Sequence, residues 1–175
     1  MQTLTIENLT LEPQTAEHAE EMFVLLSDPS IYEFENEPPS SLEWLRQRFE
    51  KLESRESADG EQRWLNWVIR VAPSGALAGY VQATILQDAS AFVGYELGSA
   101  FWGKSIARRA VEAMLLELRK SYGVRQCLAV YKTANFRSER LLKRLGFSAA
   151  PESVVQSLHL EPDESVMLLS TEAEA

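Results

Sequence analysis

The clearest pattern of hydrophobic and polar positions in this chain lies between Ser105 and Lys120. Apolar residues recur there at the spacing of one helical face, at positions 106, 107, 110, 111, 114, 115 and 118. This period predicts a helix with one buried face, and Tyr122 and Gly123 are expected to end it, because glycine readily adopts the left-handed conformation found at helix ends. A second helix is predicted over residues 135–145, closed by Gly146.

Strands are predicted where apolar and polar positions alternate, or where short apolar runs are bounded by turn residues. Residues 4–13 alternate, with a slip at Asn8, and predict one strand that ends at Pro13. Two apolar runs joined by Pro73, Ser74 and Gly75 predict an antiparallel hairpin. The runs expected to form strands from the hairpin onward are WLNWVIRV, ALAGYVQATI, AFVGYELG, VRQCLAVY and SVMLLS.

Two helices are predicted between the first strand and the hairpin. Thr15 is expected to cap one, and Ser40 with Glu43 forms the capping-box pattern of the other. The turn-rich stretch between them, SDPSIYEFENEPPS, is a candidate substrate loop or a solvated connection. The whole order predicts an α/β (α+β) fold with helices flanking a mixed sheet, as one domain over residues 1–170 with a frayed acidic tail at 171–175.

Composition narrows the class of protein. The chain has 175 residues, of which 45% are hydrophobic and 25% charged, as in ordinary globular domains, and no apolar run approaches the roughly 20 residues of a membrane span. The N-terminus lacks the pattern of a signal peptide and Cys127 has no partner for a disulfide, so we expect a cytoplasmic protein without membrane contact. His18 and His159 are far apart with no ligand pattern, which predicts no metal site.

The net charge of −9 argues against nucleic acid as the main partner, because phosphate backbones are bound by clustered Lys and Arg. A cationic acceptor would suit such a chain better, although an acidic balance also serves solubility. The apolar, strand-rich C-terminal part makes a homodimer plausible.

A short turn between Leu97 and Ser105 has the features of an anion site. It contains Gly98 and Gly103, and it leads into the predicted helix, whose first amides have no partner within the helix and carry the positive end of its dipole. Lys104 and Arg108 add positive charge. By itself the turn is also typical of strand-to-helix connections that bind nothing.

A second motif follows at the expected distance. With GYELGSAFWGKSIA and then NFRSERLLKRLGF, the sequence resembles the GNAT superfamily of N-acetyltransferases, in particular the branch of ribosomal-protein N-terminal acetyltransferases. The resemblance is strongest over residues 92–148. It implies a mixed, mostly antiparallel sheet of six to seven strands, splayed at VGYEL and flanked by about four helices. It also implies acetyl transfer from acetyl-coenzyme A, as co-substrate, to a primary amine.

The resemblance assigns the cofactor-binding residues. Backbone groups near Glu96 and Leu97 would bind the pantetheine arm, and Asn135 would contact the same arm. Ser138 would protonate the departing thiolate as a catalytic residue. The pyrophosphate would be held by the turn and first helical residues Trp102, Gly103, Lys104, Ser105, Ile106, Ala107 and Arg108.

Ser105 departs from the family pattern, which usually has a second glycine there. If the position needs a positive φ, serine costs about 1 kcal/mol or more and distorts the phosphate cradle. If the position is the helix N-cap, serine is well suited and its hydroxyl can add a phosphate contact. The second reading is the one we expect.

The reaction needs a base, because an amine with a pKa near 10.4 is mostly protonated at neutral pH. Glu96 is the first candidate, against the alternative of a surface residue, and Glu33, Glu35 and Glu37 are candidates for binding a cationic acceptor. The acceptor is expected to be a protein N-terminus or a small amine, including a polyamine or an aminoglycoside-like compound. A domain that binds coenzyme A without turnover, as a sensor or interaction module, is the alternative.

Overall fold

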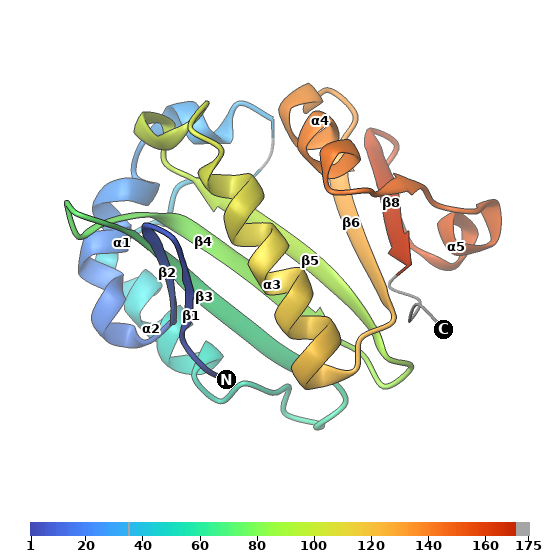
Figure 1. The fold of residues 1–175 in the computed structure, drawn as a ribbon, viewed down its shortest axis with the longest axis horizontal. Helices are drawn as coiled ribbons and strands as arrows, with labels where there is room; N and C mark the ends of the chain where they lie inside the picture. The colour runs from blue at the N-terminus through green and yellow to red at the C-terminus, as the bar shows by residue number, and fades with distance from the viewer. Residues whose placement is uncertain (35, 171–175) are drawn as a thin grey trace.

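The computed structural model describes residues 1–34 and 36–170, so the predicted tail at 171–175 lies outside the described residues. They form one eight-stranded sheet in the order β1-β2-β3-β4-β5-β6-β8-β7, in which β5 and β6 are parallel and the other neighbours antiparallel (Figure 1). The strands are β1 (Leu4–Ile6), β2 (Leu9–Pro13), β3 (Arg63–Val71), β4 (Ala76–Ile85), β5 (Ser90–Leu97), β6 (Gln126–Lys132), β7 (Ser148–Ala149) and β8 (Glu164–Ser170).

The mixed, mostly antiparallel sheet confirms the predicted fold class, with one or two strands more than expected. The slip at Asn8 is the reason for one of them, because Glu7 has a φ of 49° and turns the chain back, so that Leu4 pairs with Leu11. One predicted strand is therefore a hairpin of two. The two-residue β7 against β8 had no pattern long enough to be predicted.

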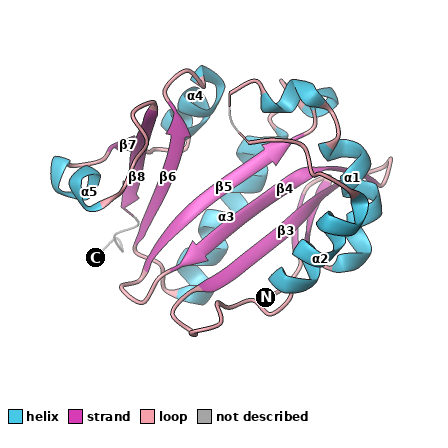
Figure 2. Ribbon diagram, turned by 180° about the vertical axis from the view of Figure 1, so that it is seen from behind, coloured by secondary structure: helices cyan, strands magenta, loops and turns pink. Residues whose placement is uncertain are grey.

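Helices cover both faces of the sheet. The α-helices are α1 (Ala19–Leu26), α2 (Leu42–Leu52), α3 (Ile106–Tyr122), α4 (Phe136–Arg144) and α5 (Glu152–Ser157). The helices α1 and α2 lie on one face and α3 on the other (Figure 2). The cap of α2 corrects a prediction: Ser41 rather than Ser40 is the N-cap, and its Oγ accepts the N–H of Trp44 at 3.0 Å.

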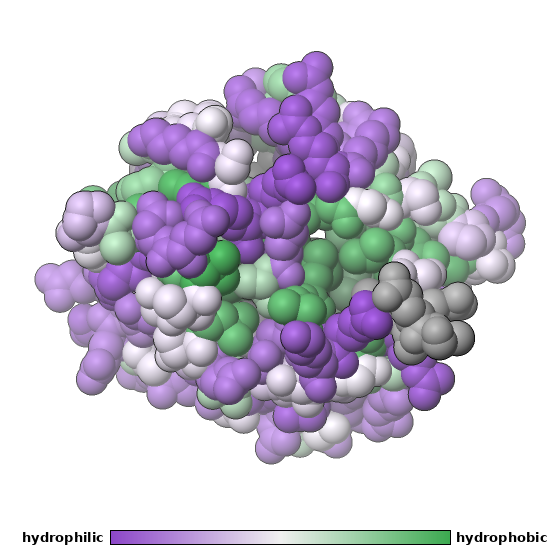
Figure 3. Space-filling view, in the orientation of Figure 1, coloured by the Kyte–Doolittle hydropathy of each residue, from purple (hydrophilic) through white to green (hydrophobic). Residues whose placement is uncertain are grey.

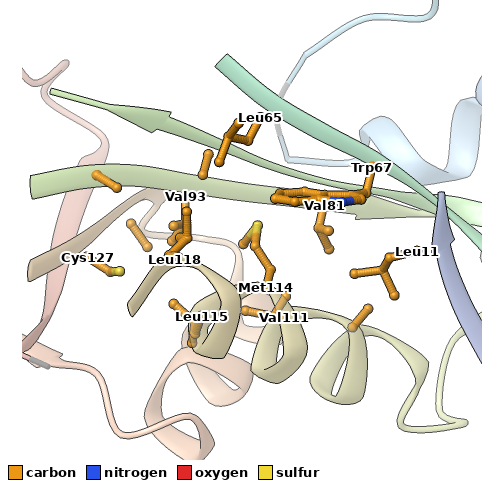
Figure 4. Close-up of a cluster of buried hydrophobic side chains, with 14 of the residues drawn as sticks. Leu11, Leu65, Trp67, Val81, Val93, Val111, Met114, Leu115, Leu118 and Cys127 are labelled. Carbon is orange, nitrogen blue, oxygen red and sulfur yellow. The ribbon is translucent and has the colours of Figure 1, made fainter. Parts of the chain in front are cut away.

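The predicted apolar face of α3 packs against the central strands. Met114 and Leu118 are fully buried in the same core as Trp67, whose indole Nε1 donates to the Gln2 carbonyl at 2.9 Å (Figure 4). Gly123 ends α3 with a φ of 67° and donates its N–H to the Leu118 carbonyl, as the pattern predicted. Cys127 is buried in the same core, and burial raises the pKa of its thiol to about 12, so the thiol stays protonated.

The feature that positions the site is the divergence of β5 from β6. The two strands pair only from Ser90 to Phe92, opposite residues 126–128, whereas β5 continues to Leu97 along β4. Beyond Phe92 the strands separate, which is the predicted splay (Figures 1 and 2). The turn to α3 follows β5 and α4 follows β6, so both predicted motifs meet at the open end of the sheet.

Candidate active site

A cavity of about 430 Å³ lies at this open end, between the end of β5 and α4. The surface is hollowed there, between α4 and the turn that precedes α3 (Figure 3). The walls bring together the residues that the two sequence motifs predicted, with Glu96, Trp102 and Ser138 among them. The predicted residues in the wall are Glu96, Leu97, Trp102, Gly103, Ser105, Ile106, Ala107, Arg108, Asn135 and Ser138.

Lys104 is a predicted cofactor residue that does not line this cavity. Its Nζ donates to the Ala100 carbonyl at 2.8 Å and lies 5.8 Å from the centre of the Phe101 ring. The positive groups that do reach the wall are Arg108, Arg137 and Arg144. Positive charge at the cavity therefore comes from α3 and α4 rather than from the turn.

The first turn of α3 lies at the wall of this cavity, where the sequence predicted an anion site. Gly103, with a φ of 73°, and Ser105, with a φ of 57°, curve the chain so that the start of the helix faces the cavity. Both residues are exposed to solvent. The 17-residue helix presents its first amides and the positive end of its dipole at this wall, where negative charge is stabilised.

Ser105 combines the two readings that the sequence left open. It is the N-cap of α3, but it is left-handed and its side chain makes no capping hydrogen bond. The expectation of a serine suited to its cap is thus corrected, because the usual N-cap has extended backbone and a side chain that accepts an amide. The residue carries the steric cost of a left-handed non-glycine position instead.

Ser105→Gly is expected to raise the melting temperature by about 2–4 °C, because it removes roughly 1 kcal/mol of left-handed strain, and to leave coenzyme A affinity nearly unchanged, because the free protein already carries that strain. Differential scanning calorimetry and titration with coenzyme A measure the two effects. Ser121→Gly, an exposed position inside α3, is the matched control and should lower the melting temperature. Weaker coenzyme A binding by Ser105→Gly would instead show that the hydroxyl contacts phosphate.

The second motif places α4 against β5. Asn135 is the N-cap of α4, and its side-chain Oδ1 accepts the N–H of Ser138 at 3.0 Å. The Ser138 Oγ lies 2.8 Å from the Tyr95 hydroxyl, a hydrogen bond in which either group can donate. Sequence reasoning missed Tyr95. Its signal was the alternation in VGYEL, which turns Tyr95 toward α4 and Glu96 to the opposite face of β5.

A second cavity of about 260 Å³ lies on that opposite face, under α1 and α2. Glu96 lines both cavities. The Tyr80 hydroxyl donates to Glu96 Oε2 at 3.4 Å, and Tyr32 also lines the second cavity. Burial and then the nearby Glu96 carboxylate raise the pKa of both tyrosines, so that they remain neutral hydrogen-bond donors beside a carboxylate.

The segment from Asp28 to Glu37 connects the two cavities. Ile31 and Phe34 line the first cavity, whereas Tyr32 and Glu37 line the second. Of the acidic residues predicted in this segment, Glu33 forms an ion pair with Arg137, Glu37 stands in the second cavity, and Glu35 lies outside the described residues.

Arg137 holds this segment against the turn that precedes α3. Its guanidinium lies 4.6 Å from the centre of the Trp102 ring and 5.6 Å from that of Phe34, and its Nη1 is 2.9 Å from Glu33 Oε2. At the other end of the segment, Asp28 accepts a hydrogen bond from Ser99. The segment is therefore attached at two points, to α4 through Arg137 and to the chain after β5 through Ser99.

Comparison with known proteins agrees with this geometry. The model of the acetyltransferase (GNAT) domain matches residues 8–148, which is most of the chain. The chain belongs to the GNAT acetyltransferase family. It is an acetyl-coenzyme A-dependent N-acetyltransferase, as its motifs predicted. No curated protein matches this acetyltransferase in sequence.

Solved structures share the fold of this acetyltransferase at low sequence identity. The ribosomal-protein-S5-alanine acetyltransferase of Vibrio fischeri has a TM-score of 0.78 at 18% identity, with 98% of each chain covered. A ribosomal L7/L12 alpha-N-protein acetyltransferase, solved with coenzyme A, has a TM-score of 0.78 at 17% identity, with 97% of this chain and 98% of that one covered. A GNAT-family acetyltransferase of Bacillus anthracis has a TM-score of 0.76 at 15% identity, with 97% and 98% covered. At such identities the likeness establishes the fold.

Two further observations concern residues 1–34 and 36–170 of the acetyltransferase. They contain no group of three or more His, Cys, Asp or Glu side chains placed to hold a metal ion. No helix among them is both long and apolar enough to cross a membrane.

Proposed function

We propose that the acetyltransferase transfers acetyl to the primary amine of a protein N-terminus or a small molecule, and that Glu96 removes the proton from that amine. The observation that carries the proposal is the position of Glu96, which lines both cavities. Acetyl-coenzyme A would occupy the first cavity and the amine would enter from the second. The two reactants then meet at the end of β5, where the carboxylate is within reach of the amine.

The first cavity suits the co-substrate. Negative pyrophosphate would lie at the amides and dipole of α3, with Arg108 and Arg144 nearby. The pantetheine arm would follow β5 beyond Phe92, where β6 has diverged and leaves an edge to which an extended chain can add. Asn135 would face this arm from the start of α4. These placements follow the family motifs residue by residue.

The chemical step would be direct attack. Glu96 accepts a proton from the ammonium group, and the nitrogen lone pair then forms a bond to the thioester carbonyl carbon. An amide N–H near Leu97 would stabilise the carbonyl oxygen as it gains negative charge. The carbon–sulfur bond breaks as the carbonyl re-forms, and the nitrogen, which is positively charged after the attack, loses its second proton to solvent. Ser138 gives its hydroxyl proton to the thiolate, and the Tyr95 hydroxyl at 2.8 Å is placed to replace that proton.

The function is tested by thiol release after mixing the enzyme with acetyl-coenzyme A and a panel of amines. Release that depends on the amine supports the proposal and ranks the acceptors. Binding of coenzyme A without release by any amine would instead identify a binding module. The panel should contain N-terminal peptides, amino sugars and polyamines.

Ser138→Ala is expected to lower the turnover number about 100-fold, which is typical of losing a general acid. The fold should be unaffected, because Asn135 caps α4 through the backbone N–H of Ser138 and not through its hydroxyl. Tyr95→Phe should cause a smaller loss, since it removes only the group that resupplies the proton. Stopped-flow detection of the released thiol measures both, and unchanged turnover in Ser138→Ala would remove Ser138 from the mechanism.

A further inference from the structure

A row of carboxamide side chains crosses the second cavity. Asn66 on β3 stands opposite Gln82 on β4, which stands opposite Gly94 on β5. Gln14 extends the row past the end of β2, because its N–H donates to the Asn66 carbonyl at 2.9 Å. All three amide side chains line the cavity, and the row runs toward β5, where Glu96 lies two residues beyond Gly94.

Gln14 is the unusual member of this row. It is 3% exposed, and its Nε2 has no hydrogen-bond partner within the part of the chain that the structure describes. The backbone of Gln14 is fixed on both sides, since its N–H is bonded to Asn66 and its carbonyl accepts from Arg55. A buried donor without a partner is costly, so the amide would be stabilised by an acceptor atom brought by a ligand.

The chemistry of this amide restricts the ligand. An N–H donor needs a lone pair, and a polyamine at neutral pH carries protonated nitrogens that can only donate. A carboxylate is disfavoured because the wall holds two carboxylates, Glu37 and Glu96, against one guanidinium, Arg48. The remaining choice is an uncharged oxygen, which is a carbonyl or a hydroxyl.

The position of Gln14 sets the distance of that oxygen from the amine. Gln14 lies about three strand spacings from β5, or about 14 Å between backbones, and side chains from both sides shorten the gap. The oxygen is therefore several bonds away from the amine at Glu96. A carbonyl in the first residues of a peptide or a hydroxyl of an amino sugar has such a separation.

We infer that the acceptor carries an uncharged hydrogen-bond-accepting oxygen several bonds from its amine, and that Gln14 Nε2 binds this oxygen. The inference rests on the proposed function for the place of the amine. It deepens that function by favouring peptides and amino sugars over oxygen-free polyamines. Gln14 is thus a specificity-determining residue for acetyl transfer.

The test compares wild type with Gln14→Leu on three probes: alanyl-alaninamide, glucosamine and 1,5-diaminopentane. Wild type should prefer an oxygen-bearing probe, and Gln14→Leu should lower kcat/KM for that probe about 10- to 100-fold while changing that for 1,5-diaminopentane less than twofold. A loss of kcat/KM confined to the dipeptide amide would show that Gln14 binds a carbonyl oxygen. A loss confined to glucosamine would show that it binds a hydroxyl oxygen. Equal losses on all three probes, no loss, or a wild-type preference for the diamine would overturn the inference.

Two controls separate recognition from folding. Gln47→Leu makes the same substitution on the exposed side of α2 and should leave all three probes unchanged. Gln14→Leu should keep or raise the melting temperature, because it replaces an unpartnered buried amide with an apolar group. A lower melting temperature would show that the amide already has a partner in the free protein, and would overturn the inference.

Binding of the same probes, measured by calorimetry without acetyl-coenzyme A, distinguishes failure of the proposed function from failure of the inference about Gln14. If no amine releases thiol but Gln14→Leu still weakens binding of an oxygen-bearing probe about tenfold or more, the proposed function is wrong and the oxygen-binding site at Gln14 is supported. If thiol is released but Gln14→Leu binds the probes with the same affinity as wild type, the inference about Gln14 is wrong and the proposed function is supported.

Discussion

Glu96→Gln is expected to lower the turnover of acetyl transfer at least about 100-fold, while coenzyme A affinity stays within about twofold of wild type. Glu96 lines both cavities, and glutamine keeps its size and its contact with Tyr80 but cannot accept a proton at neutral pH. Steady-state thiol release gives the turnover, and calorimetric titration with coenzyme A gives the affinity.

Glu37→Gln provides the matched control for Glu96→Gln. Glu37 lines the second cavity but not the first, so its loss should affect acceptor KM more than turnover. If Glu37→Gln abolishes turnover and Glu96→Gln does not, the base is assigned to the wrong carboxylate. Full activity in both variants would indicate that a water chain removes the proton.

Gly79→Ala is expected to destabilise the protein by about 3–5 kcal/mol, with a fall of about 10 °C in melting temperature. Gly79 has a φ of 152°, and an added Cβ would lie 2.0 Å from the Glu96 carbonyl oxygen and 2.8 Å from the Leu97 Cα. These are backbone atoms of β5, so the methyl group fits only if β5 moves away from β4. Because the displaced residues are those between the two cavities, activity should fall further than stability alone explains.

Gly75→Ala separates crowding from backbone conformation in this test. Gly75 also has a positive φ, at 73°, but an added Cβ would meet nothing within 4 Å. Gly75→Ala should lower the free energy of unfolding by about 1 kcal/mol, from the left-handed backbone alone. Thermal denaturation of the two variants gives the comparison, and equal melting temperatures would show that the close approach of β4 to β5 is not what Gly79 provides.

The sequence was most informative where the signal is local. The period of α3, its end at Gly123 and the start of α4 near Asn135 could be predicted because each depends on residues within one or two turns. Ser105 was ambiguous, since one residue type serves both an N-cap and a tolerated left-handed position. The position was recognisable from the motif, but its backbone angle was not.

The features that the sequence did not reveal depend on long-range register. Tyr95 meets Ser138 because α4 lies at the splayed end of β5, 43 residues further along the chain. Gln14 enters the second cavity because β2 pairs with β3, although 49 residues lie between the two strands, and nothing local marks it as different from other glutamines. Such residues become visible only when strand pairing is known.

The segment from Asp28 to Glu37 has a consequence for how this enzyme acquires new substrates. Side chains of one short stretch form walls of both cavities, and Arg137 joins that stretch to Trp102 in the turn that precedes α3. With the proposed roles of the two cavities, acceptor choice and affinity for the acyl donor would therefore be linked. A substitution here that admits a different amine would also alter a wall of the proposed donor cavity, and Arg137 of α4 is where a compensating change is expected.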